Sequence, residues 1–188
     1  MNHHPLTHFT SDWVTSRLKE WEVNFIPLDG KPIRILEVGS YEGRSACWFL
    51  QHIMNDPKSE LICVDPWGGV EGAARLRRFD MNVALSGRSN QVCRIQAKIL
   101  DVHNTIPGEF DLIYIDGDHV AKEVLTQAAV LWRKLKPEGL LLFDDYRWPS
   151  QNNGTLPPGP GIDAFLTLWD DSVEVVFKDY QALVRKKV

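Results

Sequence analysis

The sequence that decides the fold is Ile35-Leu-Glu-Val-Gly-Ser-Tyr-Glu-Gly-Arg-Ser45. The mainly apolar residues 33–38 predict a buried strand, because a short apolar run is followed at once by turn signals. Residues 39–43 predict a turn with a glycine at each end, and an apolar helix pattern begins at Ala46. A strand, a glycine turn and a helix start form the arrangement that holds nucleotide-like ligands in doubly wound α/β folds.

The spacing of the two glycines indicates which ligand the turn suits. A dinucleotide fingerprint needs a further glycine where this chain has Tyr41. Glu37 precedes the turn, and a carboxylate repels a phosphate but can hold an ammonium group. We therefore expect the ligand to be a nucleoside with a cationic tail. Gly39 would let the backbone come close to this ligand, and Gly43 would let the helix pack close to the strand. A turn that needs its glycines only for geometry is the alternative.

A second acid stands at the distance expected for a nucleoside site. Residues 60–65 predict a strand that ends in Asp65, 22 residues after Gly43 (65 − 43). An acid at the end of the second strand of a βαβ unit meets the ribose hydroxyls of a bound nucleoside, and a carboxylate can accept from both. Trp67 follows, and it either lies against the adenine or packs in the core. The alternative for Asp65 is a surface residue before a proline.

Acidic residues also follow two later strands. The predicted fourth strand, 110–115, precedes Asp116, and the predicted fifth, 140–143, precedes Asp144 and Asp145. If these strands are neighbours, the three carboxylates meet and repel one another unless a cation sits between them. Hard oxygen ligands suit Mg²⁺, or Ca²⁺ or Mn²⁺. The sequence therefore predicts these three acids as ligands of a divalent metal, with helix capping as the alternative for each acid taken singly.

His119 lies three residues after Asp116, where the next helix opens. Histidine is the side chain whose ordinary pKa lies nearest neutrality, so His119 could take a proton from a substrate hydroxyl. We expect His119 and Asp116 to be the catalytic residues. Most of the catalysis would then come from positioning and electrostatics.

Residues 37–43 resemble motif I of the class I S-adenosylmethionine-dependent methyltransferases, which reads roughly E/D-x-G-x-x-x-G. Three later stretches narrow the resemblance to a branch that includes the metal-dependent sugar O-methyltransferases of macrolide antibiotic pathways: Tyr114–His119, Leu135–Gly139 and Phe143–Tyr146. In that branch an Asp-x-x-His after strand four and an Asp-Asp pair after strand five serve as metal ligands and general base. The resemblance covers about residues 33–146.

The resemblance implies a cofactor and a reaction. The cofactor would be S-adenosylmethionine, and an acceptor oxygen that has lost its proton to His119 would take the methyl group from the sulfonium in one in-line step. Asp116, His119, Asp144 and Asp145 carry over as metal ligands and general base. The residues predicted to bind the cofactor are Glu37, Gly39, Ser40, Tyr41, Gly43, Ser45, Asp65, Trp67, Gln96, Ala97 and Asp116.

The alternation of strands and helices predicts a Rossmann-like, doubly wound α/β fold with a mostly parallel seven-stranded sheet. Residues 173–177 and 182–185 are expected to add an antiparallel C-terminal pair. We expect one domain over residues 1–188, with residues 1–30 as a helical cover and the Pro/Gly/Asn-rich residues 147–161 as a substrate loop or lid. The chain departs from the macrolide branch in this loop and in lacking a large N-terminal substrate domain, so the substrate does not carry over.

Five side chains of the N-terminal half are expected in the core. Trp13 and Trp21 belong to an N-terminal helix pattern, and we expect both to be buried. Cys47, Cys63 and Cys93 all sit inside apolar runs. With no C-x-x-C pair, they indicate buried thiols in a reducing cytosol rather than disulfides or zinc ligands.

Composition sets the remaining expectations. The net charge is 21 − 25 = −4, which argues against a nucleic-acid partner because phosphate binding favours a basic face. No run of about 18 apolar residues predicts a membrane span, and the N-terminal residues lack the pattern of a signal peptide. We therefore expect a cytoplasmic enzyme that acts on a small-molecule acceptor away from membranes, and a homo-oligomer is open.

Three other functions are open at this stage. A metal-independent methyltransferase acting on another acceptor would keep the cofactor, with Asp116 and Asp144 shaping the pocket. A nucleoside-binding module without catalysis would act as a sensor or an assembly partner. A nicotinamide dehydrogenase is the third, and Tyr41 and Glu37 argue against it.

Overall fold

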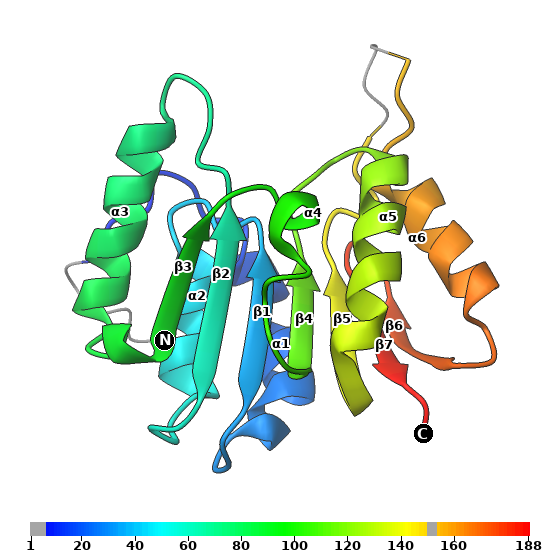
Figure 1. The fold of residues 1–188 in the computed structure, drawn as a ribbon, viewed down its shortest axis with the longest axis horizontal. Helices are drawn as coiled ribbons and strands as arrows, with labels where there is room; N and C mark the ends of the chain where they lie inside the picture. Colours follow the sequence, from blue (N-terminus) through cyan, green and yellow to red (C-terminus); the bar gives the residue numbers. More distant parts are fainter. Residues whose placement is uncertain (1–6, 150–153) are drawn as a thin grey trace. The chain divides into compact units, whose positions relative to one another are not determined.

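The computed structural model describes residues 7–149 and 154–188. Its strands form one mixed sheet in the order β3-β2-β1-β4-β5-β7-β6 (Figure 1). β1, β4 and β5 are parallel, as are β2 and β3, whereas β7 runs antiparallel to β5 and β6. This confirms the predicted Rossmann-like fold class. The strands are β1 (Arg34–Val38), β2 (Glu60–Asp65), β3 (Val92–Gln96), β4 (Phe110–Ile115), β5 (Leu135–Phe143), β6 (Val173–Lys178) and β7 (Ala182–Lys186).

The helices alternate with the parallel strands along the chain. The α-helices are α1 (Leu18–Phe25), α2 (Arg44–His52), α3 (Gly72–Leu85), α4 (Ile99–Val102), α5 (Ala121–Leu131) and α6 (Pro158–Leu168). Short 3₁₀ turns cover Thr15–Arg17, Ile26–Leu28, Ser89–Gln91 and Trp132–Lys134. Within the described residues, no helix combines the length and the apolar character that a membrane crossing requires.

The chain forms two compact units. The first contains the described residues of 1–34 together with 40–97, and the second contains 35–39 together with the described residues of 98–188. The prediction of one domain over the whole chain stays a prediction. Each unit has its own helices and strands.

An aromatic cluster forms the core of the first unit. Trp21 of α1 is fully buried and stacks on Phe49 of α2, with ring centroids 5.1 Å apart. Trp48 packs edge-on against the same Trp21 ring at 5.2 Å, and Phe25 lies within 6.3 Å of both α2 rings. Such aromatic pairs stabilise a core beyond the area that they bury. The N-terminal helix therefore covers α2, and the burial predicted for Trp21 is confirmed.

Parallel register aligns three strand ends in the second unit. Val38 of β1 lies opposite Ile115 of β4, which lies opposite Phe143 of β5. The Asp116 N–H continues the ladder by donating to the Val38 carbonyl at 2.8 Å, and the Asp144 N–H donates to the Ile115 carbonyl at 3.0 Å. The residues that follow β1, β4 and β5 therefore lie in one row at the carboxyl edge.

Helices α5 and α6 lie side by side in the second unit (Figure 1). They approach so closely that a Cβ atom on Gly161 of α6 would stand 2.1 Å from the Ala121 carbonyl oxygen of α5. Helix α6 begins at Pro158, because proline suits the first helical position, where its missing N–H is not needed. The predicted loop 147–161 is thus too long at its C-terminal end. Residues 150–153 of that loop lie outside the described residues, and its role as a lid stays a prediction.

Strand β5 is longer than predicted. The sequence predicts an exit loop over residues 135–139, but Leu135 pairs with Phe110 and the next paired residue, Leu140, lies opposite Leu112. The intervening residues bulge out of the ladder, and one of them, Glu138, has a φ of +61°. Helix α5 ends at Leu131, and a 3₁₀ turn over Trp132–Lys134 leads directly into β5.

Two of the predicted core side chains are exposed. Trp13 is 65% exposed because the first helical turn begins only at Thr15, after Asp12 accepts the Thr15 N–H at 2.9 Å. Cys93 is exposed on β3, one of the two edge strands of the sheet. Cys47 and Cys63 are buried, as predicted.

Gly39 offers a direct test of the strand-end geometry. Its φ is +86°, and a Cβ atom would lie 2.3 Å from the Asp116 carbonyl oxygen, so we expect Gly39→Ala to be strongly destabilising. Gly30 has a matching φ of +87° with open space around it. Gly30→Ala should therefore cost only the left-handed backbone strain, about 1–2 kcal/mol. Gly39→Ala should cost about 1–3 kcal/mol more from overpacking, measured by urea unfolding. Equal losses would contradict the close approach.

Candidate active site

Asp65 organises the glycine turn of the first unit. Its Oδ2 accepts the N–H groups of Ser40 and Tyr41 at 3.0 Å each, and its Oδ1 accepts the Trp67 N–H at 2.6 Å. A carboxylate has about four acceptor positions, so the fold already uses three of them. The expected pair of ribose bonds to Asp65 stays a prediction, and this geometry leaves about one position for it.

The Trp67 side chain packs against the glycine turn and is hydrogen-bonded to it. It is 4% exposed, its Nε1 donates to the Tyr41 carbonyl at 2.7 Å, and its ring lies 5.1 Å from that of Phe79. Trp67 is thus packed against the fold, and its contact with the adenine stays a prediction. The Tyr41 ring contacts the Trp13 ring at 5.2 Å and the Arg75 guanidinium at 5.0 Å.

Both glycines of the turn lie against neighbouring parts of the chain. A Cβ on Gly39 would collide with the backbone of Asp116, which directly follows β4. Gly43 has a φ of +80°, and a Cβ there would meet the Phe79 ring of α3 at 3.0 Å. Gly43 therefore makes room for α3 rather than for a strand. Approach of a ligand to Gly39 stays a prediction.

Three other predicted cofactor residues also belong to the first unit. Gln96 lies opposite Asp65 in the β2–β3 ladder, and its side-chain amide donates weakly to the Pro66 carbonyl at 3.4 Å. The Ala97 N–H donates to the Asp65 carbonyl at 3.1 Å. Ser45 is buried in α2. The structure thus brings Gln96 and Ala97 beside Asp65.

An acidic cluster follows the aligned strands of the second unit. Glu37 is fully buried on β1, opposite Tyr114 of β4. Asp116, which follows β4, shares the Tyr114 hydroxyl with Asp144, which follows β5: that hydroxyl lies 3.1 Å from Asp116 Oδ2 and also donates to Asp144 Oδ2. The cluster is therefore built from three neighbouring strands.

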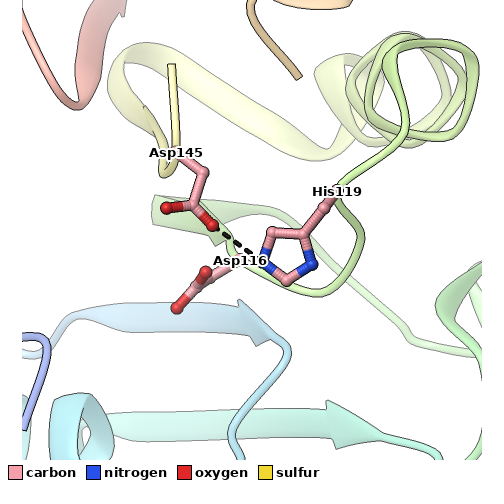
Figure 2. Close-up of side chains that lie close together, drawn as sticks. All are labelled: Asp116, His119 and Asp145. Carbon is pink, nitrogen blue, oxygen red and sulfur yellow. Dashed lines mark ion pairs between the residues drawn. The ribbon is translucent and has the colours of Figure 1, made fainter. Parts of the chain in front are cut away.

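Asp116, His119 and Asp145 point toward one another at this edge (Figure 2). One ligand atom from each lies within 4.8 Å of the others, a grouping that could hold a metal ion. His119 Nε2 lies 2.8 Å from Asp145 Oδ2. The structure thus brings the two predicted catalytic residues, His119 and Asp116, together with Asp145.

Asp144 is turned to other partners. Besides the Tyr114 hydroxyl, its Oδ2 accepts the Gln181 side-chain amide at 2.9 Å, and its Oδ1 accepts the Asp145 N–H at 2.7 Å. The three acids predicted as metal ligands are therefore not grouped as a set, since His119 takes the place of Asp144. Tyr114 could have been noticed as a polar residue two positions before Asp116, on the same face of the strand. Gln181 carries no comparable signal.

Charge in the cluster is poorly compensated. Burial, followed by the charges of Asp144 and Asp145, raises the pKa of Asp116 well above its usual range. Burial also raises the pKa of Asp144, against the opposing hydrogen bond from Tyr114. The hydrogen bond to Asp145 raises the pKa of His119, although burial opposes it. The edge therefore favours cations and protons.

Trp148 covers His119. Asp145 has a φ of +58°, and its carbonyl accepts the Trp148 N–H at 2.9 Å, so the chain after β5 turns back on itself. The ring centroids of Trp148 and His119 are 4.8 Å apart with an interplanar angle of 34°. No pattern in the sequence predicts this contact.

Comparison with known proteins identifies the family. The family model described as a methyltransferase domain matches residues 36–146, which is more than half of the chain. The chain belongs to this methyltransferase family. The match includes the glycine turn and both acidic strand ends, and it confirms the resemblance to the class I S-adenosylmethionine-dependent enzymes.

Individual methyltransferases show the same fold. The O-methyltransferase hkm8 of Aspergillus hancockii is 32% identical over 131 residues, which are 68% of this chain and 49% of that protein. The structure of TomG from Streptomyces achromogenes, an O-methyltransferase of tomaymycin synthesis in complex with SAM, has a TM-score of 0.66 at 14% identity, covering 98% of this chain and 93% of that one. An O-methyltransferase from Bacillus cereus in complex with SAH has a TM-score of 0.69 at 16% identity, covering 97% and 84%. This methyltransferase chain spans about half the length of the curated relatives that it matches.

The His119–Asp145 pair of this methyltransferase should titrate measurably. Because the folded pKa of His119 is raised, the pair stabilises the fold fully below the ordinary histidine pKa of about 6.5 and loses that contribution as pH rises through the folded value. We expect Asp145→Asn to lower the His119 pKa, measured by NMR of the imidazole C–H signals, because the hydrogen bond to the Asp145 carboxylate, the largest cause of the raised pKa, would lose its charged acceptor while burial remains.

Asp118→Asn is the matched control, since Asp118 raises the His119 pKa only through its charge. It should lower that pKa by less than Asp145→Asn does. Equal shifts in the two variants would contradict the hydrogen-bonded pair.

Proposed function

We propose that this chain is an S-adenosylmethionine-dependent methyltransferase that methylates a hydroxyl of a small molecule, with His119 as the general base. The observation that carries the proposal is the 2.8 Å contact between His119 Nε2 and Asp145 Oδ2 beside Asp116. A carboxylate in this position fixes the tautomer and the orientation of an imidazole, as the aspartate does for the histidine of a catalytic triad. With Nε2 held by Asp145, Nδ1 is the nitrogen that takes the proton.

Glu37 suits a cofactor that carries a positive charge, and Asp65 suits a cofactor that has ribose hydroxyls. When bound, S-adenosylmethionine supplies the methyl group on its sulfonium. Glu37, fully buried two residues before Gly39, would hold the ammonium group by a charge-assisted hydrogen bond. Asp65 would accept a ribose hydroxyl. A pyrophosphate is disfavoured because Glu37 and Asp116 carry its own sign of charge.

The donor set of Asp116, Asp145 and His119 also fits a divalent cation. Carboxylates suit Mg²⁺ and Mn²⁺, and one ligand atom from each of the three residues lies within 4.8 Å of the others. Asp116 and Asp145 would hold the cation, which would orient acceptor oxygens and lower the pKa of a hydroxyl. His119 would remain the group that moves the proton.

The acceptor follows from the same residues. An alcohol or phenol hydroxyl is the group whose proton a histidine base can usefully take. The Trp148 ring, tilted against that of His119, gives this edge an aromatic wall. The O-methyltransferase names of hkm8 and TomG support a hydroxyl of a small molecule as the acceptor.

The cofactor assignment is tested by calorimetric titration with S-adenosylhomocysteine beside NAD⁺. We expect micromolar binding of the first and none of the second. Glu37→Gln should weaken binding about 10–100-fold, since a hydrogen bond to a charged group contributes about 1.5–3 kcal/mol. Glu174→Gln, the same change on an exposed residue of β6, should leave the dissociation constant unchanged. Binding of NAD⁺ in preference would overturn the assignment.

The chemistry is tested by methyl transfer to a panel of vicinal diols and catechols. His119→Asn should lower the rate about 100–10,000-fold, as expected for loss of a general base. His103→Asn, whose ring lies beside the Leu100 carbonyl on α4, serves as the control. An unchanged rate of methyl transfer in His119→Asn would show that His119 is not the general base.

Chelation separates the metal-assisted reaction from a metal-independent one, which the His119–Asp145 contact could support by itself. We expect EDTA to abolish methyl transfer and added Mg²⁺ or Mn²⁺ to restore it. Full activity in EDTA, with cofactor binding intact, would establish the metal-independent reaction. Cofactor binding with no turnover on any acceptor, with or without metal, would favour a binding module.

A further inference from the structure

Tyr114 occupies a distinctive place on β4. It is 1% exposed, and its hydroxyl contacts Oδ2 of Asp116 at 3.1 Å and Oδ2 of Asp144. These two acids follow different strands of the sheet. One buried phenol therefore ties together the side chains at two strand ends.

Asp144 is itself held from two other directions. Gln181, which directly precedes β7, donates its side-chain amide to Oδ2 at 2.9 Å, and the Asp145 N–H donates to Oδ1 at 2.7 Å. Since β7 is the antiparallel neighbour of β5, the Gln181 contact is fixed by the sheet. Asp144 is thus an anchor, and Tyr114 connects this anchor to Asp116.

The surroundings keep Tyr114 a hydrogen-bond donor. The phenol is buried, and its hydroxyl donates to Asp144 Oδ2 while lying 3.1 Å from Asp116 Oδ2. A neutral donor satisfies a buried carboxylate, whereas a carboxylate left without one costs stability.

We propose that Tyr114 is a positioning residue, which holds the Asp116 carboxylate in the orientation that a divalent cation requires by bridging it to the fixed Asp144. The inference rests on the proposed metal site. Tyr114 acts on the metal through Asp116. Gln181 acts less directly, by holding Asp144 with its side-chain amide. Residues that orient metal-binding carboxylates typically change metal affinity 10–100-fold when they are removed.

The test is Tyr114→Phe, which removes one oxygen atom and keeps the ring. Mn²⁺ binding to the purified protein is followed by electron paramagnetic resonance, and S-adenosylhomocysteine binding is measured beside it as a check of the fold. We expect Mn²⁺ affinity to fall about 10–100-fold while the affinity for S-adenosylhomocysteine changes little. Crystal structures of both proteins should show the Asp116 side chain in a new orientation in the variant.

Tyr146→Phe is the matched control, because the Tyr146 hydroxyl also donates to a carboxylate, that of the exposed Asp163, outside this bridge. It should retain the Mn²⁺ affinity of the unmodified protein. Wild-type Mn²⁺ affinity in Tyr114→Phe would overturn the proposal. If Tyr114→Phe does not fold, Gln181→Met replaces it, with a smaller loss of affinity expected and no loss overturning the proposal.

Failure of the proposed metal site is distinguishable from failure of this inference. If the unmodified protein binds no Mn²⁺, the metal part of the proposed function is wrong. The orientation of Asp116 in the two crystal structures then decides the role of Tyr114. An unchanged Asp116 side chain would show that Tyr114 does not position it.

Discussion

The backbone of Asp116 lies where a side chain at position 39 would stand, and this close approach sets the geometry of the second unit. A Cβ atom on Gly39 would be 2.3 Å from the Asp116 carbonyl oxygen. The Asp116 N–H also bonds the Val38 carbonyl, so β1 and β4 stay joined to their last residues. The bond from the Asp144 N–H to the Ile115 carbonyl extends the same register to β5. Backbone pairing alone therefore gathers the acids that follow these strands, before any side-chain contact is made.

Gathering buried acids destabilises the fold unless their charge is offset. Burial raises the pKa of Asp116 and of Asp144, so the folded protein binds more protons than the unfolded chain. The contribution of these groups to stability therefore falls as pH rises above the ordinary carboxyl pKa of about 3.9. Tyr114 and Gln181 offset part of the cost as neutral donors, and His119 offsets more when it is protonated. Acids of like charge that destabilise the fold where they meet are expected at a site that is kept for function rather than for stability.

The fold was predictable because its signals are local. A strand, a glycine turn and a helix follow one another within the quoted stretch, and the acids stand directly after apolar runs. The partners of those acids were not predictable. Asp144 is held by Gln181, 37 residues away, through a contact that only the β5–β7 pairing creates. Helical spacing similarly predicted a buried Trp13, but the bond from the Thr15 N–H to Asp12 delays the first turn and leaves the indole exposed. Packing over such distances decides which acids face one another.

Backbone strain provides a further link between the fold and the proposed chemistry. Among the described residues, four that are not glycine have a positive φ, and three of them, Tyr41, Trp67 and Asp145, follow β1, β2 and β5 by no more than three residues; the fourth lies in the β5 bulge. Each such conformation costs about 1–3 kcal/mol and persists only where neighbouring contacts enforce it. Carboxylates make those contacts: Asp65 accepts the N–H groups of Tyr41 and Trp67, and the carboxylate of Asp145 itself pairs with His119. Each of these three strained residues therefore either contacts or is an acid to which the proposed reaction gives a role. Glycine at these positions would relieve the strain but would also remove the Trp67 indole from beneath the turn and the Asp145 carboxylate from His119.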